Sequence, residues 1–274
     1  MSTQPVVSLR GVTKSFGAGG VTALQSIDLD VLAGEFVSLI GPSGCGKSTL
    51  LRVVGDLVDA TSGEVVVNGK SARQARRDGD YGIVFQDAVL YDWRTVAKNI
   101  ALPLELLGWG KARREKRVEE LLGLVELQGF GGLHPWQLSG GMQQRVSIAR
   151  ALSFSPALLL MDEPFGALDE MTRERLNGEL LRIWEMSGST VIFVTHSISE
   201  AVFLSTRVVV MSRRPGRIAA LVDIDLPQPR NADTREEPHF FELVTEVRDR
   251  LREGGLNEES TAPGEGELVG EGTP

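Results

Sequence analysis

Apolar and polar positions along the chain form two patterns that alternate with each other. Short runs of consecutive apolar residues predict strands that are buried on both faces, whereas apolar residues spaced three or four positions apart predict helices. The predicted buried strands are residues 34–41, 81–86, 157–162, 190–195 and 207–212. Because helical segments separate most of these strands, we expect a mainly parallel sheet that is covered by helices on both sides.

The N-terminal part of the chain carries a different strand pattern. Its β-rich segments are residues 6–16, 24–31 and 63–70. Glycine-containing turns bound these segments, which is typical of antiparallel strands and hairpins. A helix is predicted over residues 49–58, and Arg73, Arg76 and Arg77 are interpreted as part of a solvated surface loop.

Helical spacing dominates the middle of the chain. Helices are predicted at residues 93–108, 111–127, 142–152, 170–187 and 197–205. The first three form a helical subdomain inserted into the α/β core at about residues 88–156. An edge strand is expected at 217–226. The predicted organisation is therefore one main domain over residues 1–230, a C-terminal helix within 231–253, and a disordered acidic tail over 254–274.

Composition narrows the class of protein. The 274 residues are 42% apolar and 24% charged, which is typical of a soluble globular protein with one or two domains. The net charge of −8 argues against a nucleic-acid partner, because such binders need a basic surface that displaces counterions. Cys45 is the only cysteine, so no intrachain disulfide forms and the cytoplasm is the expected compartment. Without a long apolar run or a secretory signal, any membrane contact is expected to go through a partner.

The segment GPSGCGKST follows a predicted buried strand and opens a predicted helix, where a phosphate-binding loop must stand. Its glycines let backbone N–H groups wrap phosphates, Lys47 reaches the β and γ oxygens, and the Ser48 hydroxyl ligates Mg²⁺. A chance glycine-rich turn is the alternative, which this strand and helix context disfavours. The predicted phosphate loop comprises Gly41, Pro42, Ser43, Gly44, Cys45, Gly46, Lys47, Ser48 and Thr49. Cys45 is expected only to fill a small-residue position.

A second predicted anion site lies in LSGGMQQRV, residues 138–146, which we call the signature segment. Ser139, Gly140 and Gly141 lead into a helix, and a helix start presents N–H groups and a positive dipole end to an anion. The chain therefore carries two phosphate-binding helix starts but only one loop built around a lysine.

Polar side chains at the ends of other predicted strands complete the candidate site. Asp162 is suited to hold Mg²⁺, and Glu163 is suited to act as general base toward water, although an Asp-Glu pair can also cap a helix. His196 is a candidate contact for a γ-phosphate, with a structural histidine as the alternative. Gln86 is a candidate ligand of Mg²⁺ or of the attacking water, with an ordinary polar strand end as the alternative.

In this order the motifs resemble those of the ATP-binding subunits of ABC transporters. The matching segments are the phosphate loop, Gln86, LSGGMQQR at 138–145, LLLMDEP at 158–164, ALD at 167–169 and His196. The resemblance covers about residues 5–230, and the joint occurrence is more specific than any single motif. It implies ATP and Mg²⁺ as cofactors, and a P-loop NTPase core with an N-terminal antiparallel β subdomain and an inserted α-helical subdomain.

The resemblance also implies why there are two anion sites. In that family two subunits face each other head to tail, so each ATP lies between the phosphate loop of one and the signature segment of the other. Ser139, Gly140 and Gly141 would then serve the nucleotide of a second copy. Asp169 would cross the interface between copies, and Phe16 would stack on adenine, with a plain core aromatic as its alternative.

Further segments resemble one subgroup, the importer subunits of the nitrate, sulfonate, taurine and bicarbonate type. They are residues 93–108, 164–177, 195–218 and 226–230. The resemblance implies ATP-driven import of a small anion through permease subunits at the cytoplasmic face of the membrane, with a solute-binding protein as an indirect partner. Residues 92–100 are the expected permease contact. Tyr91-Asp92 departs from the Leu-Pro common there, which bears on partner choice and not on catalysis.

Three other functions remain open at this point. An ABC ATPase of an exporter or of another importer class shares the same motifs. An ABC ATPase outside transport would carry long coiled coils, two ATPase units or basic patches. A P-loop small-molecule kinase shares the phosphate loop but has no use for the signature segment. The transported solute is not readable from this chain, because the motor does not contact it.

Overall fold

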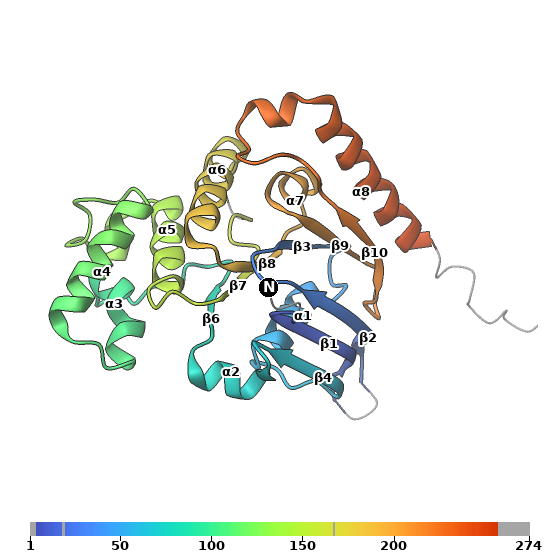
Figure 1. Ribbon diagram of the computed structural model, residues 1–274, viewed down its shortest axis with the longest axis horizontal. Coiled ribbons are helices and arrows are strands. Elements are labelled where there is room, and N and C mark those ends of the chain that lie inside the picture. The colour runs from blue at the N-terminus through green and yellow to red at the C-terminus, as the bar shows by residue number, and fades with distance from the viewer. Residues whose placement is uncertain (1–3, 18–19, 167, 257–274) are drawn as a thin grey trace, which may run out of the picture.

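The computed structural model describes residues 4–17, 20–166 and 168–256. Its centre is a sheet with the strand order β10-β9-β3-β8-β7-β6 (Figure 1). The strands are β3 (Phe36–Ile40), β6 (Tyr81–Val84), β7 (Leu158–Asp162), β8 (Thr190–Val194), β9 (Arg207–Met211) and β10 (Ile218–Asp223). All neighbours are parallel except β10, which pairs antiparallel with β9 at the edge. The predicted mainly parallel sheet is confirmed.

A second, antiparallel sheet has the order β2-β1-β4-β5. It consists of β1 (Val7–Ser15), β2 (Thr22–Val31), β4 (Ser62–Val67) and β5 (Lys70–Ser71). The helix α1 (Lys47–Val54) shares one apolar core with this sheet and with one face of the central sheet. The phosphate loop, which runs from β3 into α1, is therefore fixed between the two sheets.

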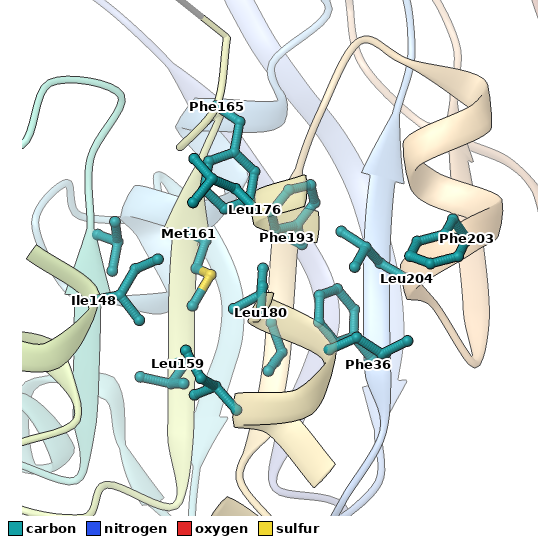
Figure 2. Close-up of a cluster of buried hydrophobic side chains, with 14 of the residues drawn as sticks. Phe36, Ile148, Leu159, Met161, Phe165, Leu176, Leu180, Phe193, Phe203 and Leu204 are labelled. Carbon is teal, nitrogen blue, oxygen red and sulfur yellow. The ribbon is translucent and has the colours of Figure 1, made fainter. Parts of the chain in front are cut away.

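Successive side chains along a strand point to opposite faces of the sheet, so each central strand contributes apolar side chains to both faces. On β7, Leu159 and Met161 belong to the core under the helices, whereas Leu158 and Leu160 face α1 and the antiparallel sheet. Figure 2 shows the first of these cores, where Met161 lies among Phe165, Leu176, Phe193 and other apolar side chains. Burial on both faces explains why these strands are continuous apolar runs in the sequence.

The remaining helices lie in two groups. The helices α3 (Val96–Leu106), α4 (Lys111–Leu124) and α5 (Gly140–Ala151) form a lobe at one end of the molecule (Figure 1). The helices α6 (Glu170–Ser187), α7 (Ile198–Leu204) and α8 (Pro238–Leu256) cover one face of the central sheet. Short 3₁₀ helices span Pro135–Gln137 and Asp233–Glu236. Among the described residues, no helix is both long and apolar enough to cross a membrane.

Several predicted elements differ from the structure. The predicted basic loop is wrong: residues 72–78 form the helix α2 (Ala72–Asp78), which Ser71 caps at its start and Gly79 ends in the left-handed region. The arginines Arg73 and Arg76 lie on it and pair with Asp59 and Asp56. It was missed because the helix is short and polar.

Other differences concern the ends of elements. The helix predicted to reach residue 58 ends at Val54, because Gly55 caps it. The strand predicted to end at Gln86 ends at Val84, which leaves Gln86 in a loop. The last helix continues to Leu256, past the residue 254 at which the tail was predicted to begin. Residues 257–274 of that tail lie outside the described residues. The predicted domain boundaries remain predictions.

Candidate functional site

The strand order brings the predicted residues to one edge of the central sheet. The carboxyl ends of β3, β8, β7 and β6 are neighbours there, although the strands are far apart in the sequence. In order, these ends lead into the phosphate loop, His196, the Asp162-Glu163 pair and the loop of Gln86. Ligands bind at this edge in open parallel sheets, because the turns after the strands leave a crevice.

The phosphate loop is tightly packed, and its glycines are needed where they stand. Gly46 has a φ of 109°, and a Cβ added to it would lie 2.8 Å from the carbonyl oxygen of Ala23. The Lys47 ammonium is held across the loop, donating to the carbonyl oxygens of Gly41 at 2.8 Å and Pro42 at 3.2 Å. Such a loop presents N–H groups and one fixed cation to an anion.

A cavity of about 400 Å³ opens beside this loop, within the size range of nucleotide-sized ligands. Its lining residues are Phe16, Val21, Ala23, Ser43, Gly44, Gly46, Lys47, Ser48, Thr49, Glu163, His196 and Arg214. We call this cavity the main pocket. Of the predicted phosphate-loop residues, Gly41, Pro42 and Cys45 lie outside its lining, and Cys45 is buried.

Phe16 lines the main pocket and follows directly after β1. Its side chain is 47% exposed, which is unusual for a large aromatic that serves only the core. The Lys14 ammonium lies 4.9 Å from the ring centroid, a cation–π distance. An exposed ring above a phosphate loop fits a base that stacks on it, so the lining suits a nucleotide from base to phosphates.

Two oxygen-bearing side chains suited to a metal meet beside the main pocket, where Ser48 belongs to the lining and Asp162 does not. The Ser48 hydroxyl donates to Asp162 Oδ1 at 2.6 Å, and Asp162 is buried. The Arg52 guanidinium lies 3.7 Å from the other carboxylate oxygen. Proteins hold Mg²⁺ with one or two such oxygen ligands while phosphate oxygens and water complete the shell, so this donor set fits that ion.

Glu163 follows Asp162 with its backbone turned into the left-handed region, at a φ of 46°. Its N–H donates to the carbonyl oxygen of Val194 on β8, which fixes the turn. The turn directs the two neighbouring carboxylates differently: Asp162 bonds Ser48, whereas Glu163 lines the main pocket 3.6 Å from His196 Nδ1. Non-glycine residues in this region cost about 1–3 kcal/mol and collect at functional sites.

His196 stands on a polar network that sequence reasoning missed. The Thr195 hydroxyl donates to a carboxylate oxygen of Glu200 and accepts from the N–H of Ser197. Glu200 is buried on α7, and burial raises the pKa of its carboxyl group, with Thr195 opposing the shift. The network fixes the backbone on both sides of His196, whose side chain remains 55% exposed toward the main pocket.

Gln86 lies beside the main pocket, outside its lining. A Cβ added to Gly166 would lie 3.5 Å from Gln86 Nε2 and 3.6 Å from Glu163 Oε2, so both side chains reach the same spot. The loop that carries Gln86 is bonded to α5. Gln144 Nε2 donates to the carbonyl oxygen of Phe85, and the Arg150 guanidinium donates to those of Ala88 and Val89.

The signature segment lies apart from the main pocket of the same chain. Ser139 caps α5, and its hydroxyl accepts from the N–H of Met142 at 3.3 Å. A Cβ on Gly140 would meet nothing within 4 Å, so the helix start is open. Asp169 is likewise a cap, on α6, where its carboxylate accepts from the N–H of Thr172. The hydrogen bonds from Thr172 lower the pKa of Asp169.

Comparison with known proteins decides the family. The family model described as ABC transporter matches residues 24–166. An uncharacterized ABC transporter ATP-binding protein of Methanocaldococcus jannaschii is 48% identical over 249 residues, covering 90% of this chain and 91% of that protein. The chain belongs to the ABC transporter family. It is an ATP-binding subunit with ATPase activity, as the phosphate loop and the signature segment had indicated.

Two further ABC proteins are similar to this chain. The aliphatic sulfonates import ATP-binding protein of Bacillus thuringiensis subsp. konkukian is 44% identical over 252 residues, covering 91% of this chain and 97% of that protein. A solved dimeric ATP-binding cassette, in a post-hydrolysis state with ADP and phosphate, is 36% identical with a TM-score of 0.71. The match covers 81% of this chain and all of that one. The predicted ABC ATPase fold is confirmed.

The structure adds residues to this ABC cassette that the motifs did not reveal. Val21, Ala23 and Arg214 line the main pocket together with the phosphate loop. Val21 and Ala23 precede the strand predicted over 24–31, and only the pairing of β1 with β2 and the bond from the Phe16 N–H to the carbonyl oxygen of Val21 show where they lie. Arg214 stands in the segment SRRPGRI, whose resemblance to importer subunits gave a family signal but no position in space.

Proposed function

We propose that this chain is the motor subunit of an importer for a small anion, and that it works in a head-to-tail pair of copies. The observation that carries the pairing is the separation of its two anion sites. The phosphate loop lines the main pocket, while the open helix start at Ser139 lies outside it. A second copy turned head to tail supplies the missing half of each reaction chamber. The dimeric cassette with ADP and phosphate supports this arrangement.

Within one copy, the residues of the sheet edge divide the work of phosphoryl transfer to water. Lys47 neutralises the β- and γ-phosphates, and Ser48 with Asp162 would hold Mg²⁺. The bound metal–nucleotide supplies the reactive phosphoryl group and part of the charge neutralisation. Glu163 orients a water molecule and accepts its proton at the carboxylate, which the turn after β7 directs toward the main pocket. His196, 3.6 Å from Glu163, contacts the γ-phosphate.

The other residues act at the edges of the chamber. Gln86 reaches the same spot as Glu163, where it would bind the metal or the attacking water. Phe16 stacks on the adenine in the main pocket. Ser139, Gly140 and Gly141 present their N–H groups to the γ-phosphate held by the second copy. Asp169, at the start of α6, contacts the second copy near both chambers.

The lobe of α3, α4 and α5 offers a surface for the permease. Trp93 is 74% exposed and packs against Tyr91, with the ring centroids 4.8 Å apart. The buried Asn99 fixes this turn: it accepts from the N–H of Tyr91 and donates to the carbonyl oxygens of Tyr91, Arg94 and Thr95. A groove of about 440 Å³ runs beside it between α3 and α4, with Ala97, Ala101, Val118 and Leu122 among its lining. Docking there places the chain at the cytoplasmic face of the membrane.

The proposed cargo is an organic sulfonate such as taurine, delivered to the permease by an extracytoplasmic solute-binding protein. The support is the similarity to the aliphatic sulfonates import protein. Purification of the complex from membranes, followed by ligand binding to its solute-binding protein, tests this part. High-affinity binding of sulfonates is expected. A solute-binding protein that prefers nitrate or bicarbonate would overturn the sulfonate assignment and leave the motor role intact.

Substitution of Ser139 tests the paired chambers. In Ser139→Glu a carboxylate replaces the hydroxyl at the open helix start and repels the γ-phosphate of the second copy. We expect ATP hydrolysis to fall by about 10²-fold or more, because an anion-stabilising group contributes that much. The affinity of a single copy for ATP is expected to stay unchanged, and ATP-dependent dimers are expected to be lost in gel filtration.

The chain offers a matched control for this substitution. Ser71 is also an exposed serine that caps a helix, α2, but it lies in the antiparallel sheet region away from the signature segment. Ser71→Glu should therefore hydrolyse ATP at the wild-type rate. Full hydrolysis by a strictly monomeric Ser139→Glu protein would refute the paired arrangement.

A further inference from the structure

The geometry points to Arg214 as a further nucleotide-binding residue, one that braces the phosphate loop and contacts a phosphate group common to ADP and ATP. It lies in the turn between β9 and β10, 170 residues after the phosphate-loop residue Gly44 that it bonds. The inference deepens the description of the main pocket. It requires nucleotide binding by one copy but neither the second copy nor the permease.

The turn that carries Arg214 is internally rigid. The Ser212 N–H donates to the carbonyl oxygen of Arg217 at 2.9 Å, and the Arg217 N–H donates back to the Ser212 hydroxyl at 3.1 Å. The same hydroxyl donates to the carbonyl oxygen of Arg213 at 3.0 Å. Arg214 therefore projects from a closed hairpin tip with a defined backbone.

This hairpin tip is also fixed against the pocket. The Gly216 N–H donates to the carbonyl oxygen of Ala23, and the Gln25 N–H donates to that of Gly216, both at 2.9 Å. A Cβ added to Gly216 would lie 2.1 Å from the carbonyl oxygen of Cys45, so the backbone of the tip touches that of the phosphate loop. The tip cannot retreat without breaking these contacts.

Arg214 uses only one edge of its guanidinium for this attachment. Its Nε and Nη2 atoms donate to the carbonyl oxygen of Gly44, at 3.1 and 2.9 Å. The Nη1 atom has no acceptor within hydrogen-bond distance among residues 4–17, 20–166 and 168–256. Because the side chain lines the main pocket, this remaining edge is available to a bound anion.

The charge and the position of Arg214 indicate which part of the nucleotide it contacts. Lys47 is buried and is proposed to bind the terminal phosphates, whereas Arg214 is exposed and bonds Gly44 in the pocket that Phe16 also lines. An anion between the base and the terminal phosphates lies nearest to this guanidinium. The guanidinium of Arg214 is planar, and its Nε and Nη2 atoms are already hydrogen-bonded to Gly44. Its side chain therefore loses little conformational freedom when it binds phosphate.

Nucleotide titrations of the full-length chain test the assignment. Arg214→Ala is expected to weaken binding of both ADP and a non-hydrolysable ATP analogue by about tenfold, the effect of one charge-assisted hydrogen bond. Arg214→Lys keeps the charge without the fork and should fall between this variant and the wild type. In steady-state assays the KM for ATP should rise in both variants while kcat at saturating ATP stays unchanged, because the contact persists throughout the reaction.

The neighbouring arginine provides the control. Arg213 is exposed on the same tip but does not line the main pocket, so Arg213→Ala removes an equal charge and should bind nucleotides as the wild type does. The proposal is overturned if Arg214→Ala binds like Arg213→Ala, or if kcat falls while KM is unchanged. It is also overturned if ATP binding weakens and ADP binding does not. Arg214→Lys keeps the test decisive should the alanine variant fold poorly.

Discussion

Glu163 and Asp162 show how one backbone angle separates two chemical roles. Both are carboxylates at the end of β7, and an extended backbone would place them on opposite faces of the sheet. The left-handed turn at Glu163 instead directs its side chain into the main pocket, while Asp162 stays buried against Ser48. The proposed roles of metal ligand and of base toward water thus fall to adjacent residues.

Substitution of Glu163 tests the proposed base. Glu163→Gln removes the proton acceptor but keeps the shape, so turnover should fall by about 10²–10⁴-fold, the usual contribution of a positioned base. Affinity for ATP and ATP-dependent dimerisation should be retained, because the amide adds no charge. Phosphate release under saturating ATP and equilibrium binding together measure both effects.

A control for this substitution lies on the antiparallel sheet. Glu64 is an exposed carboxylate on β4, so Glu64→Gln should leave turnover unchanged. Normal hydrolysis by Glu163→Gln would show that another group activates the water. His196, which lies 3.6 Å from Glu163, would then be the next residue to test.

At the residue scale, the sequence was informative wherever spacing alone dictates the chemistry. The phosphate loop, the Asp162-Glu163 pair and His196 follow apolar runs, so their places at strand ends could be predicted. Arg214 could not be predicted in the same way, because its role depends on contacts between the β9–β10 turn, β2 and the phosphate loop. Such contacts join segments distant in sequence and leave no local pattern.

At the scale of elements, a polar side chain caps the start of several helices. Ser71, Ser139, Asp169 and Ser197 each cap the helix that follows by accepting from a backbone N–H. The cap at Ser139 leaves the following N–H groups of the signature segment open to an anion. Asp169 therefore also stabilises the start of α6, a role that the family resemblance did not indicate. An Asp directly before a predicted helix is the sequence pattern typical of such a cap.

A surface histidine links α8, whose apolar side chains pack in the core, to the segment after β10. His239 Nε2 lies 2.6 Å from Asp225 Oδ1, and Nδ1 lies 3.1 Å from Glu242 Oε2. Hydrogen bonds to Asp225 and then Glu242 raise the pKa of His239 above its ordinary value of 6.5. The bond to His239 lowers the pKa of Asp225 below 3.8. The charged pair therefore stabilises the folded state most between these two ordinary values.

The pH dependence follows from the direction of each shift. The contribution of His239 is complete below pH 6.5 and is lost as pH rises through its raised pKa, while that of Asp225 is lost as pH falls through its lowered pKa. The Tm of the wild type relative to His239→Gln should therefore be higher at about pH 5.5 than at about pH 8.5. A difference in Tm that does not change with pH would contradict this role.

At the scale of elements, most of the fold followed from apolar periodicity. The long helix α6 and the buried strands were predicted within a residue or two, because burial on one or both faces imposes a clear pattern. The helix α2 was missed because only its ends carry a signal, in Ser71 and Gly79, and its surface is polar. The order of strands in the central sheet, with β8 between β3 and β7, has no local signature at all.

At the scale of the whole molecule, the surface proposed for the permease lies apart from the main pocket. The lobe of α3, α4 and α5 stands at one end, and the antiparallel sheet with the phosphate loop lies toward the other (Figure 1). The turn with Tyr91 and Trp93 is tied to the lobe by Asn99 and by a contact of 3.1 Å between His134 Nδ1 and the carbonyl oxygen of Asp92. A partner bound at this turn would therefore act on the lobe as a unit.

Trp93 provides the test of the permease surface. An aromatic anchor in an interface typically contributes about 2 kcal/mol or more, so Trp93→Ala should weaken capture of the permease from detergent-solubilised membranes by at least about tenfold. ATP binding by the isolated chain should not change, because Trp93 does not line the main pocket. Quantitative co-purification with a tagged chain measures the loss.

Phe241 supplies the matched aromatic for this test. It is 56% exposed on α8, away from the lobe, so Phe241→Ala should capture the permease as the wild type does. Equal losses in both variants would indicate a general effect of exposed aromatics. Undiminished capture by Trp93→Ala would place the docking surface elsewhere on the chain.

The hydrogen bonds from α5 to the loop of Gln86 couple the movements of these two segments. Ser139 caps the start of α5, and Gln144 and Arg150 lie farther along the helix. Their side chains donate to backbone carbonyl oxygens on both sides of Gln86, those of Phe85, Ala88 and Val89. Because α5 is bonded to this loop, a tilt of the helix would move Ser139 and the loop of Gln86 together. In the proposed pair of copies, a rotation of the lobe would therefore shift Gln86 in one chamber and Ser139 in the other, and the two chambers would open in concert.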